Sequence, residues 1–191
     1  MPIATALLTA ERWADFADLF GKQGACYGCW CTHFRLPPAV RRENDRERNR
    51  DFMRRRVEEG PPPGVLAYEG EKAIGWMQIG RRADVPQWNN AGRASAPLIP
   101  DEESDDRCWA VSCFFIRSGA RGKGLTHSLV EAGVAHARSS NARVVDACPM
   151  DQAKNSRSTG LFVGSSRVFE KAGFERIAER KPGRPLMRLV L

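Results

Sequence analysis

The chain has 191 residues, 42% of them hydrophobic and 28% charged, which is typical of a soluble globular domain. A formal net charge of +7 permits an anionic partner, either nucleic acid or a cofactor with several phosphates. No apolar run approaches the roughly 18 residues of a membrane-spanning helix, and no basic region precedes a long apolar run at the N-terminus, so we expect a cytoplasmic protein. Six cysteines in a chain of this length do not indicate a secreted disulfide scaffold.

The first third of the chain predicts two helices. Apolar residues from Trp13 to Phe20 recur at helical spacing after Thr9, a residue suited to cap a helix. Residues 40–59 are densely charged, with few apolar anchors, and predict a mostly solvated helix that ends at Gly60. Acidic and basic residues are interleaved along this helix, which favours pairs between its own side chains over a stripe that binds nucleic acid.

The remainder of the chain predicts the strands and helices of a single mixed α/β domain over 1–191. Apolar patterns predict strands at 65–68, 73–79, 108–116, 142–148, 174–178 and 186–191, and helices at 124–138 and 165–171. The stretch 81–107 is long, polar and contains proline. A segment of that kind inside a compact domain is usually functional or mobile.

One strand–loop–helix segment has the pattern of an anion-binding site. The continuous apolar strand 108–116 runs through a glycine-rich loop into the helix that begins near Gly124. Gly122 and Gly124 leave backbone N–H groups unobstructed, and the start of a helix favours negative charge. Arg121 and Lys123 add positive charge. The sequence therefore predicts a pyrophosphate cradle that is built mostly from backbone.

The loop does not match the common nucleotide-binding patterns. The pattern GxxxxGK[ST] fails because Gly124 follows Lys123, and GxGxxG fails because His127 stands at the third glycine. Residues 121–126 (RGKGLT) instead resemble the [QR]xxGx[GA] acyl-CoA loop of the GNAT superfamily of N-acyltransferases, from which they depart only at Thr126. Residues 169–174 (FEKAGF) resemble the late helix of the same family.

The resemblance implies a single GNAT-like α/β domain in which a central, mostly antiparallel, splayed sheet is flanked by helices. It implies an acyl-CoA-binding core at 108–174 and a variable acceptor-side segment at 24–60, as in a branch of actinobacterial type with a Cys-Trp-Cys motif near the N-terminus. Acetyl-CoA would be the co-substrate, and no metal is expected. The residues that the resemblance assigns to the cofactor are Phe115, Ile116, Arg121, Gly122, Lys123, Gly124, Leu125, Thr126 and Phe169.

The implied activity is transfer of an acetyl group from acetyl-CoA to a primary amine of a small molecule or peptide by direct attack. Two catalytic features of the family are missing. Phe169 replaces a tyrosine that often protonates the departing thiolate, a role that Ser165, Ser166 or a water could take. Strand 108–116 carries no glutamate, so the candidate base is Asp146, with a structural pairing to an arginine as the alternative.

Other functions stay open at this point. A sheet that binds acyl-CoA without turnover would act as a sensor, and the missing acid and base would suit that role. A basic nucleic-acid-binding module is less favoured because acids are interleaved with the arginines of 41–56. We expect no membrane partner, and a homodimer is left open.

Four side chains that could ligate a soft metal lie within eight residues, namely Cys26, Cys29, Cys31 and His33. If the segment is a strand, the last three share one face. Zinc sites usually join two separated pairs of ligands, so a lining of the acceptor pocket, or plain core, is favoured over a metal site. Cys113 and Cys148 have apolar neighbours and are expected to be core residues and not nucleophiles.

Overall fold

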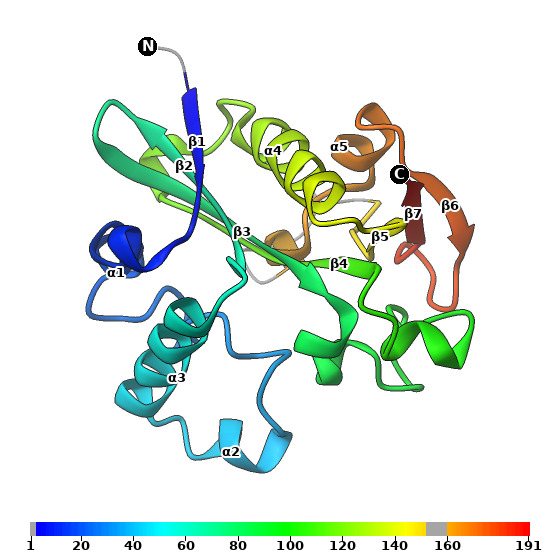
Figure 1. The fold of residues 1–191 in the computed structure, drawn as a ribbon, viewed down its shortest axis with the longest axis horizontal. Coiled ribbons are helices and arrows are strands. Elements are labelled where there is room, and N and C mark those ends of the chain that lie inside the picture. The colour runs from blue at the N-terminus through cyan, green and yellow to red at the C-terminus, as the bar shows by residue number, and fades with distance from the viewer. Residues whose placement is uncertain (1–2, 152–159) are drawn as a thin grey trace.

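The computed structural model describes residues 3–151 and 160–191, and its centre is a seven-stranded sheet (Figure 1). The strand order is β1-β2-β3-β4-β5-β7-β6, and every pair is antiparallel except β4 with β5. The predicted single α/β domain with a mostly antiparallel sheet is confirmed. The strands are β1 (Ile3–Leu7), β2 (Gly64–Glu69), β3 (Lys72–Arg81), β4 (Cys108–Ile116), β5 (Val144–Ala147), β6 (Glu175–Ala178) and β7 (Leu186–Val190).

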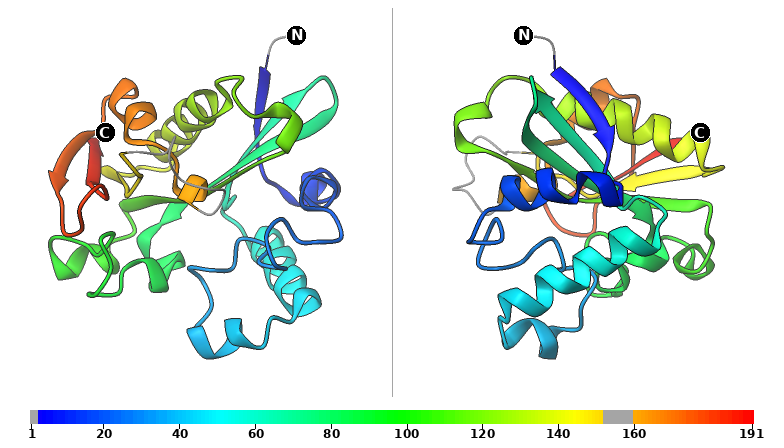
Figure 2. Two further views of the ribbon diagram at one scale, coloured as in Figure 1. Left: turned by 180° about the vertical axis from the view of Figure 1, so that it is seen from behind. Right: turned by 60° about the vertical axis from the view of Figure 1, so that its left-hand side comes forward.

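Helices cover both faces of the sheet (Figure 2). One face carries α4 (Leu125–Ser139) and α5 (Ser166–Lys171). The other carries α1 (Trp13–Phe20), α2 (Pro38–Arg42) and α3 (Arg46–Glu59). Each face has its own apolar core, because side chains of β2, β3 and β4 alternate between the two.

A close contact fixes α4 against the sheet. A Cβ atom added at Gly133, in the middle of α4, would lie 2.2 Å from the Cε of Met77 on β3. A larger residue at this position would therefore displace the end of the Met77 side chain and crowd Ile79, whose Cδ1 would lie at 3.2 Å. The contact matters for function because the start of α4 follows the glycine-rich loop.

Two elements near the N-terminus differ from the prediction. Ile3–Leu7 forms the edge strand β1, which was not predicted because this short, half-exposed segment lacks a clear apolar alternation. The helix predicted at 40–59 is interrupted between α2 and α3. Asn44 has a φ of 50°, and the Asp45 carboxylate accepts a 3.0 Å hydrogen bond from the backbone N of Arg48, which caps α3.

The cysteine-rich segment is a series of turns and not a strand, so its residues do not alternate between two faces. Besides two glycines, four residues of this segment have positive φ, between 46° and 66°, namely Ala25, Tyr27, Trp30 and Cys31. The expected cap at Thr9 is also absent. Its side chain makes no capping hydrogen bond, and a short 3-10 helix, Ala10–Arg12, lies between it and α1.

The polar stretch 81–107 is folded around one buried arginine. It contains the 3-10 helices Arg82–Asp84, Pro86–Trp88 and Pro100–Glu103. The Arg82 side chain is fully buried, and its guanidinium carbon lies 4.8 Å from the centroid of the Trp88 ring.

Among the described residues, no helix combines the length and apolarity needed to cross a membrane.

Candidate active site

The strands β4 and β5 separate half-way along β4. Cys108–Val111 pairs with Val144–Ala147, and β5 then ends while β4 continues to Ile116. No strand of the described residues lies beside the second half of β4 on this side. The Ile116 oxygen accepts a 3.3 Å hydrogen bond from Nε of Arg121, and the other backbone groups that face this side are free to bind an extended ligand.

A β-bulge at Ser112 marks the point of separation. On β3, Gln78 pairs with Cys113 and Ile79 pairs with Val111, so Ser112 has no partner of its own. The extra residue bends the strand and reverses which residues face each side. Beyond the bulge, Phe114 packs in the core beneath α4, whereas Cys113 and Phe115 face the opposite side.

The first cavity lies on the α4 side of β4 and has a volume of about 310 Å³. Its walls are Phe114 and Ile116 of β4, the loop before α4, and residues of the chain leading into α5. The described lining is Phe114, Ile116, Ala120, Arg121, Gly122, Gly124, Leu125, Thr126, Phe162, Gly164, Ser165 and Val168.

The loop at the end of this cavity has the properties of an anion cradle. Gly122 and Gly124 have φ of 81° and 77°, a conformation that residues with a Cβ rarely adopt. Among the described residues, apart from its own chain neighbours, neither glycine has an atom within 4 Å of a Cβ built on it, so the backbone is open to a ligand. Gly124 has no side chain with which to cap α4, and among the described residues the backbone N–H groups of Leu125 and Thr126 remain available.

Three residues assigned to the cofactor lie away from this cavity. The Lys123 ammonium forms a 3.0 Å ion pair with Glu69. Phe115 faces the opposite side of the sheet, although its backbone belongs to the free edge of β4. Phe169 is fully buried, with its ring 6.1 Å from Phe114 and 5.1 Å from Phe174 between centroids. The other six line the cavity.

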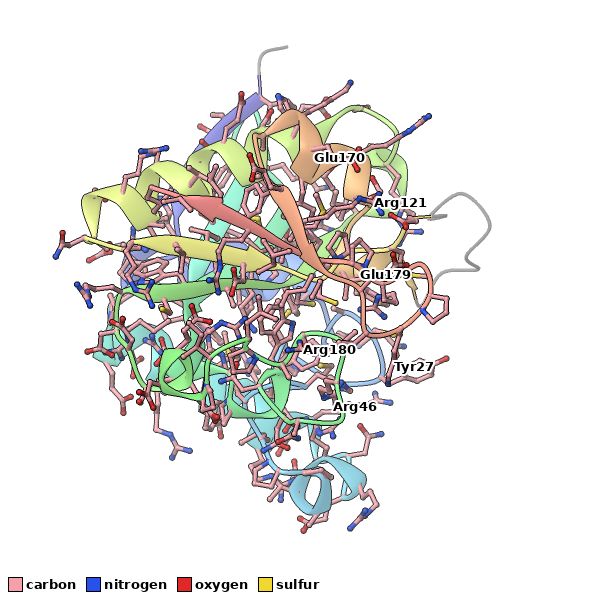
Figure 3. The ribbon with its side chains drawn as sticks, turned by 90° about the vertical axis from the view of Figure 1, so that its right-hand side faces the viewer. Tyr27, Arg46, Arg121, Glu170, Glu179 and Arg180 are labelled. Atoms are coloured by element: carbon pink, nitrogen blue, oxygen red, sulfur yellow. The ribbon has the colours of Figure 1, made fainter. Side chains whose placement is uncertain are left out.

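A second cavity, of about 460 Å³, lies on the opposite side of β4. Phe162 lines both cavities, so the two adjoin near the bulge. Figure 3 shows Arg121 and Tyr27 at the same edge of the molecule, on opposite sides of the sheet. The described lining is Ala25, Cys26, Tyr27, Cys29, Cys31, Thr32, His33, Phe34, Arg41, Asn44, Asn49, Ser112, Cys113, Phe115, Phe162 and Val163.

Comparison with known proteins places this architecture. The sequence model of the acetyltransferase (GNAT) family matches residues 28–164. The chain belongs to the GNAT family. No curated protein matches the sequence significantly.

Several solved structures share the GNAT fold of this chain. The yncA protein of Salmonella typhimurium, with its cofactor acetyl-CoA, has a TM-score of 0.57 at 16% identity, over 99% of this chain and 94% of its own. An N-acetyltransferase, paia, of Thermoplasma acidophilum in complex with coenzyme A has 0.55 at 10% identity, over 100% of both chains. A ribosomal-protein-alanine N-acetyltransferase of Brucella melitensis has 0.55 at 18%, also over 100% of both.

A polar chain connects the bulge of this GNAT protein to its N-terminal third. The Ser112 hydroxyl accepts a 2.7 Å hydrogen bond from the Gln78 amide, whose oxygen accepts a 3.2 Å bond from Nε of Arg35. Burial, and then the charge of Arg56, lower the pKa of the Arg35 guanidinium to about 10. The backbone oxygen of Asp84 accepts another bond from Arg35, at 3.0 Å.

Two thiols of the second cavity, Cys29 and Cys31, are protonated at neutral pH. Burial raises the pKa of Cys29 to about 11 and also raises that of Cys31. The Sγ atoms of Cys31 and Cys113 are 3.5 Å apart, and the Trp76 indole donates to Cys31 at 3.2 Å. In the described part of the chain no group of His, Cys, Asp or Glu could hold a metal ion.

Asp146 lies in a buried ion-pair network on β5. Its side chain is 0% exposed, and its two oxygens accept bonds of 2.6 Å from Arg82 and 2.7 Å from Arg188. Arg188 also binds both oxygens of Glu102, at 2.8 Å each. Asp146 is not among the residues that line either cavity. This position favours the structural pairing with arginine over the role of a base.

Proposed function

We propose that this GNAT protein is an acetyl-CoA-dependent N-acetyltransferase that acetylates a primary amine bound in the second cavity. The observation that carries the proposal is the meeting of two cavities at the free edge of β4. One ends in the glycine cradle, which suits the pyrophosphate of acetyl-CoA. The likeness in fold to proteins solved with acetyl-CoA or coenzyme A supports this assignment.

In this proposal the residues divide the work along β4. Backbone N–H groups of Gly122, Gly124 and the first turn of α4 hold the pyrophosphate, and Arg121 adds a mobile positive charge. The backbone of β4 from Ser112 to Ile116 binds the pantetheine arm. The thioester then lies near the bulge, where the two cavities adjoin.

The second cavity can deliver the amine in its reactive neutral form without a carboxylate. Its described lining is largely apolar and includes no Asp or Glu. Such surroundings disfavour an ammonium ion and lower the pKa of the bound amine. The neutral nitrogen attacks the acetyl carbon, the carbon–sulfur bond breaks, and the nitrogen passes its extra proton to water.

The departing thiolate needs little help, because a thiol has a pKa of about 8.5. We assign Ser165 to donate a hydrogen bond to this thiolate, because it lines the first cavity and its side chain makes no capping bond to α5. Ser166 is buried and bonds to Asp151. Asp146, in this proposal, is structural and not catalytic.

The test is calorimetric titration with acetyl-CoA beside a free-thiol assay on a panel of primary amines. The proposal expects binding, and thiol release that depends on the amine. Binding with no release from any amine would favour the sensor, for which the buried Phe169 is the supporting observation. No binding at all would contradict the cradle. Ser165→Ala should lower kcat and leave the affinity for acetyl-CoA unchanged.

A further inference from the structure

Two arginines flank one corner of the second cavity. His33 and Phe34 both line it, with their rings 4.7 Å apart between centroids. Arg41 also lines the cavity and donates from Nη1 to Nδ1 of His33 at 2.9 Å. The guanidinium carbon of Arg93 lies 5.1 Å from the centroid of Phe34. Arg41 therefore contacts one, and Arg93 the other, of two adjacent lining residues, and Arg93 stands behind Phe34 without lining the cavity itself.

No carboxylate of the protein neutralises these two charges. All 23 Asp and Glu residues lie in 3–151 and 160–191, the part of the chain that the structure describes, and none is within 4.0 Å of Arg41 or Arg93 there. The buried Nε of Arg41 has no hydrogen-bond partner among the described residues. By contrast, Arg82 and Arg188 are fully paired with acids.

The neighbouring groups add to this positive field. Arg184 donates to the backbone oxygens of Cys148 and Pro149, so its charge is solvated by dipoles and not cancelled. Burial, and then the charges of Arg41 and Arg184, lower the pKa of Arg93. Burial, and then Arg41 and Arg93, lower the pKa of His33 to about 4, so this imidazole is neutral at pH 7.

We infer that Arg41 and Arg93 form an anion subsite that binds an acidic group, a carboxylate or a phosphate, on the amine acceptor. The inference rests on the proposed function, because it names the class of acceptor for the same site. The cavity wall supplies the rest of the description through the rings of Tyr27, Phe34, Phe115 and Phe162. The acceptor is thus a small amine with an apolar body and one anionic group, such as a free amino acid with an apolar side chain, and not a polyamine.

Matched acceptors test this on the full chain. Phenylalanine and phenylalaninamide share one body and differ in the carboxylate, and O-phosphoethanolamine and ethanolamine differ in the phosphate. In the thiol assay one acid should exceed its neutral counterpart at least tenfold in kcat/KM. The acid that wins identifies the anion as carboxylate or phosphate. Spermidine as the best acceptor, or equal rates for acid and neutral partner, would overturn the subsite.

Charge-removing variants test the residues. Arg41→Gln and Arg93→Gln should each raise KM for the preferred acid about 10- to 100-fold, the loss expected for one charge-assisted hydrogen bond. KM for the neutral partner should stay within about twofold. Arg138→Gln is the matched control, since Arg138 is exposed in the last turn of α4, on the other side of the sheet. An equal effect of all three variants would overturn the assignment.

Binding of the product separates a failed subsite from a failed enzyme. N-acetylphenylalanine keeps the carboxylate and needs no turnover, so its affinity can be measured by calorimetry even if no amine releases thiol. Binding that exceeds that of N-acetylphenylalaninamide, and that Arg41→Gln weakens at least tenfold, supports the subsite. The subsite would be overturned if N-acetylphenylalanine did not bind and no acidic amine were acetylated. It would also be overturned if Arg41→Gln lost affinity for acetyl-CoA, because that result would place Arg41 in the cofactor site.

Discussion

The role of Asp146 can be tested by replacing it with asparagine, which keeps the shape and removes the charge. Arg82 and Asp146 are both 0% exposed, so the guanidinium loses its only anionic partner in a site without water contact. Its remaining acceptors are neutral, Asn89 at 2.8 Å and the backbone of Ser95 at 3.4 Å. Arg188 suffers less, because Glu102 still binds it.

The expected cost is that of leaving one buried charge uncompensated, about 3–5 kcal/mol in the free energy of unfolding. For a chain of this length the midpoint of thermal unfolding should fall by roughly 10 °C. Asp18→Asn is the matched control, because Asp18 pairs with Arg117 at 2.6 Å but is 69% exposed. A surface pair of that kind contributes at most about 1 kcal/mol.

The assay combines thermal unfolding, followed by circular dichroism, with thiol release measured well below the midpoint. A structural Asp146 predicts a large loss of stability and a kcat within about threefold of the wild type where the variant is folded. Pairing Asp146→Leu with Arg82→Met should restore part of the stability, since a buried ion pair can be exchanged for apolar groups. Unchanged stability together with abolished turnover would refute this reasoning and return Asp146 to the role of a base.

Three further predictions concern the two cavities. Gly124→Val should weaken acetyl-CoA binding at least tenfold in calorimetry, because valine disfavours the φ of 77° and its side chain would fill the open side of the loop. Gly119→Val is the control, because φ is not positive there. Equal affinities of the two variants would contradict the cradle. Iodoacetamide should alkylate Cys29 on the order of 100-fold more slowly than an ordinary thiol at pH 8, because the pKa of Cys29 is about 11. Mass spectrometry of the modified peptide measures the rate of alkylation. An ordinary rate would mean that the Cys29 thiol is not buried. His33 has a pKa of about 4 in the folded state and near 6.5 in the unfolded state. Its contribution to stability is therefore complete above pH 6.5 and is lost as the pH falls towards 4. NMR titration of the ring measures the folded pKa, and the free energy of unfolding of His33→Gln should depend less on pH over this range.

Local signals in the sequence were sufficient to predict the strand–loop–helix geometry that we propose for the cofactor. The strand 108–116, the glycines and the helix start lie within one continuous stretch, and their conformations follow from residue type. The face that each β4 side chain occupies was not predictable in the same way. The bulge at Ser112 reverses the alternation, and it is defined only by pairing with β3, over 30 residues earlier.

The acceptor side could not be read from the sequence because distant segments build it. Arg93 reaches Phe34 from 59 positions away, and the Cys31 and Cys113 thiols that meet in the cavity are 82 positions apart. The turns of the cysteine-rich segment depend on positive φ at residues with no preference for it, such as Trp30. No local sequence pattern predicts contacts of this kind.

The hydrogen-bonded chain from Arg35 to Ser112 has a consequence for engineering the specificity of this enzyme class. Exchanging the segment 24–60 between relatives would be a natural way to change specificity. That segment contains Arg35 but not its hydrogen-bonded partners Gln78 and Ser112. A graft that brings an apolar residue at position 35 would strand the buried Gln78 oxygen, at a cost of about 1–3 kcal/mol. In chimeras, positions 35, 78 and 112 should therefore be exchanged together.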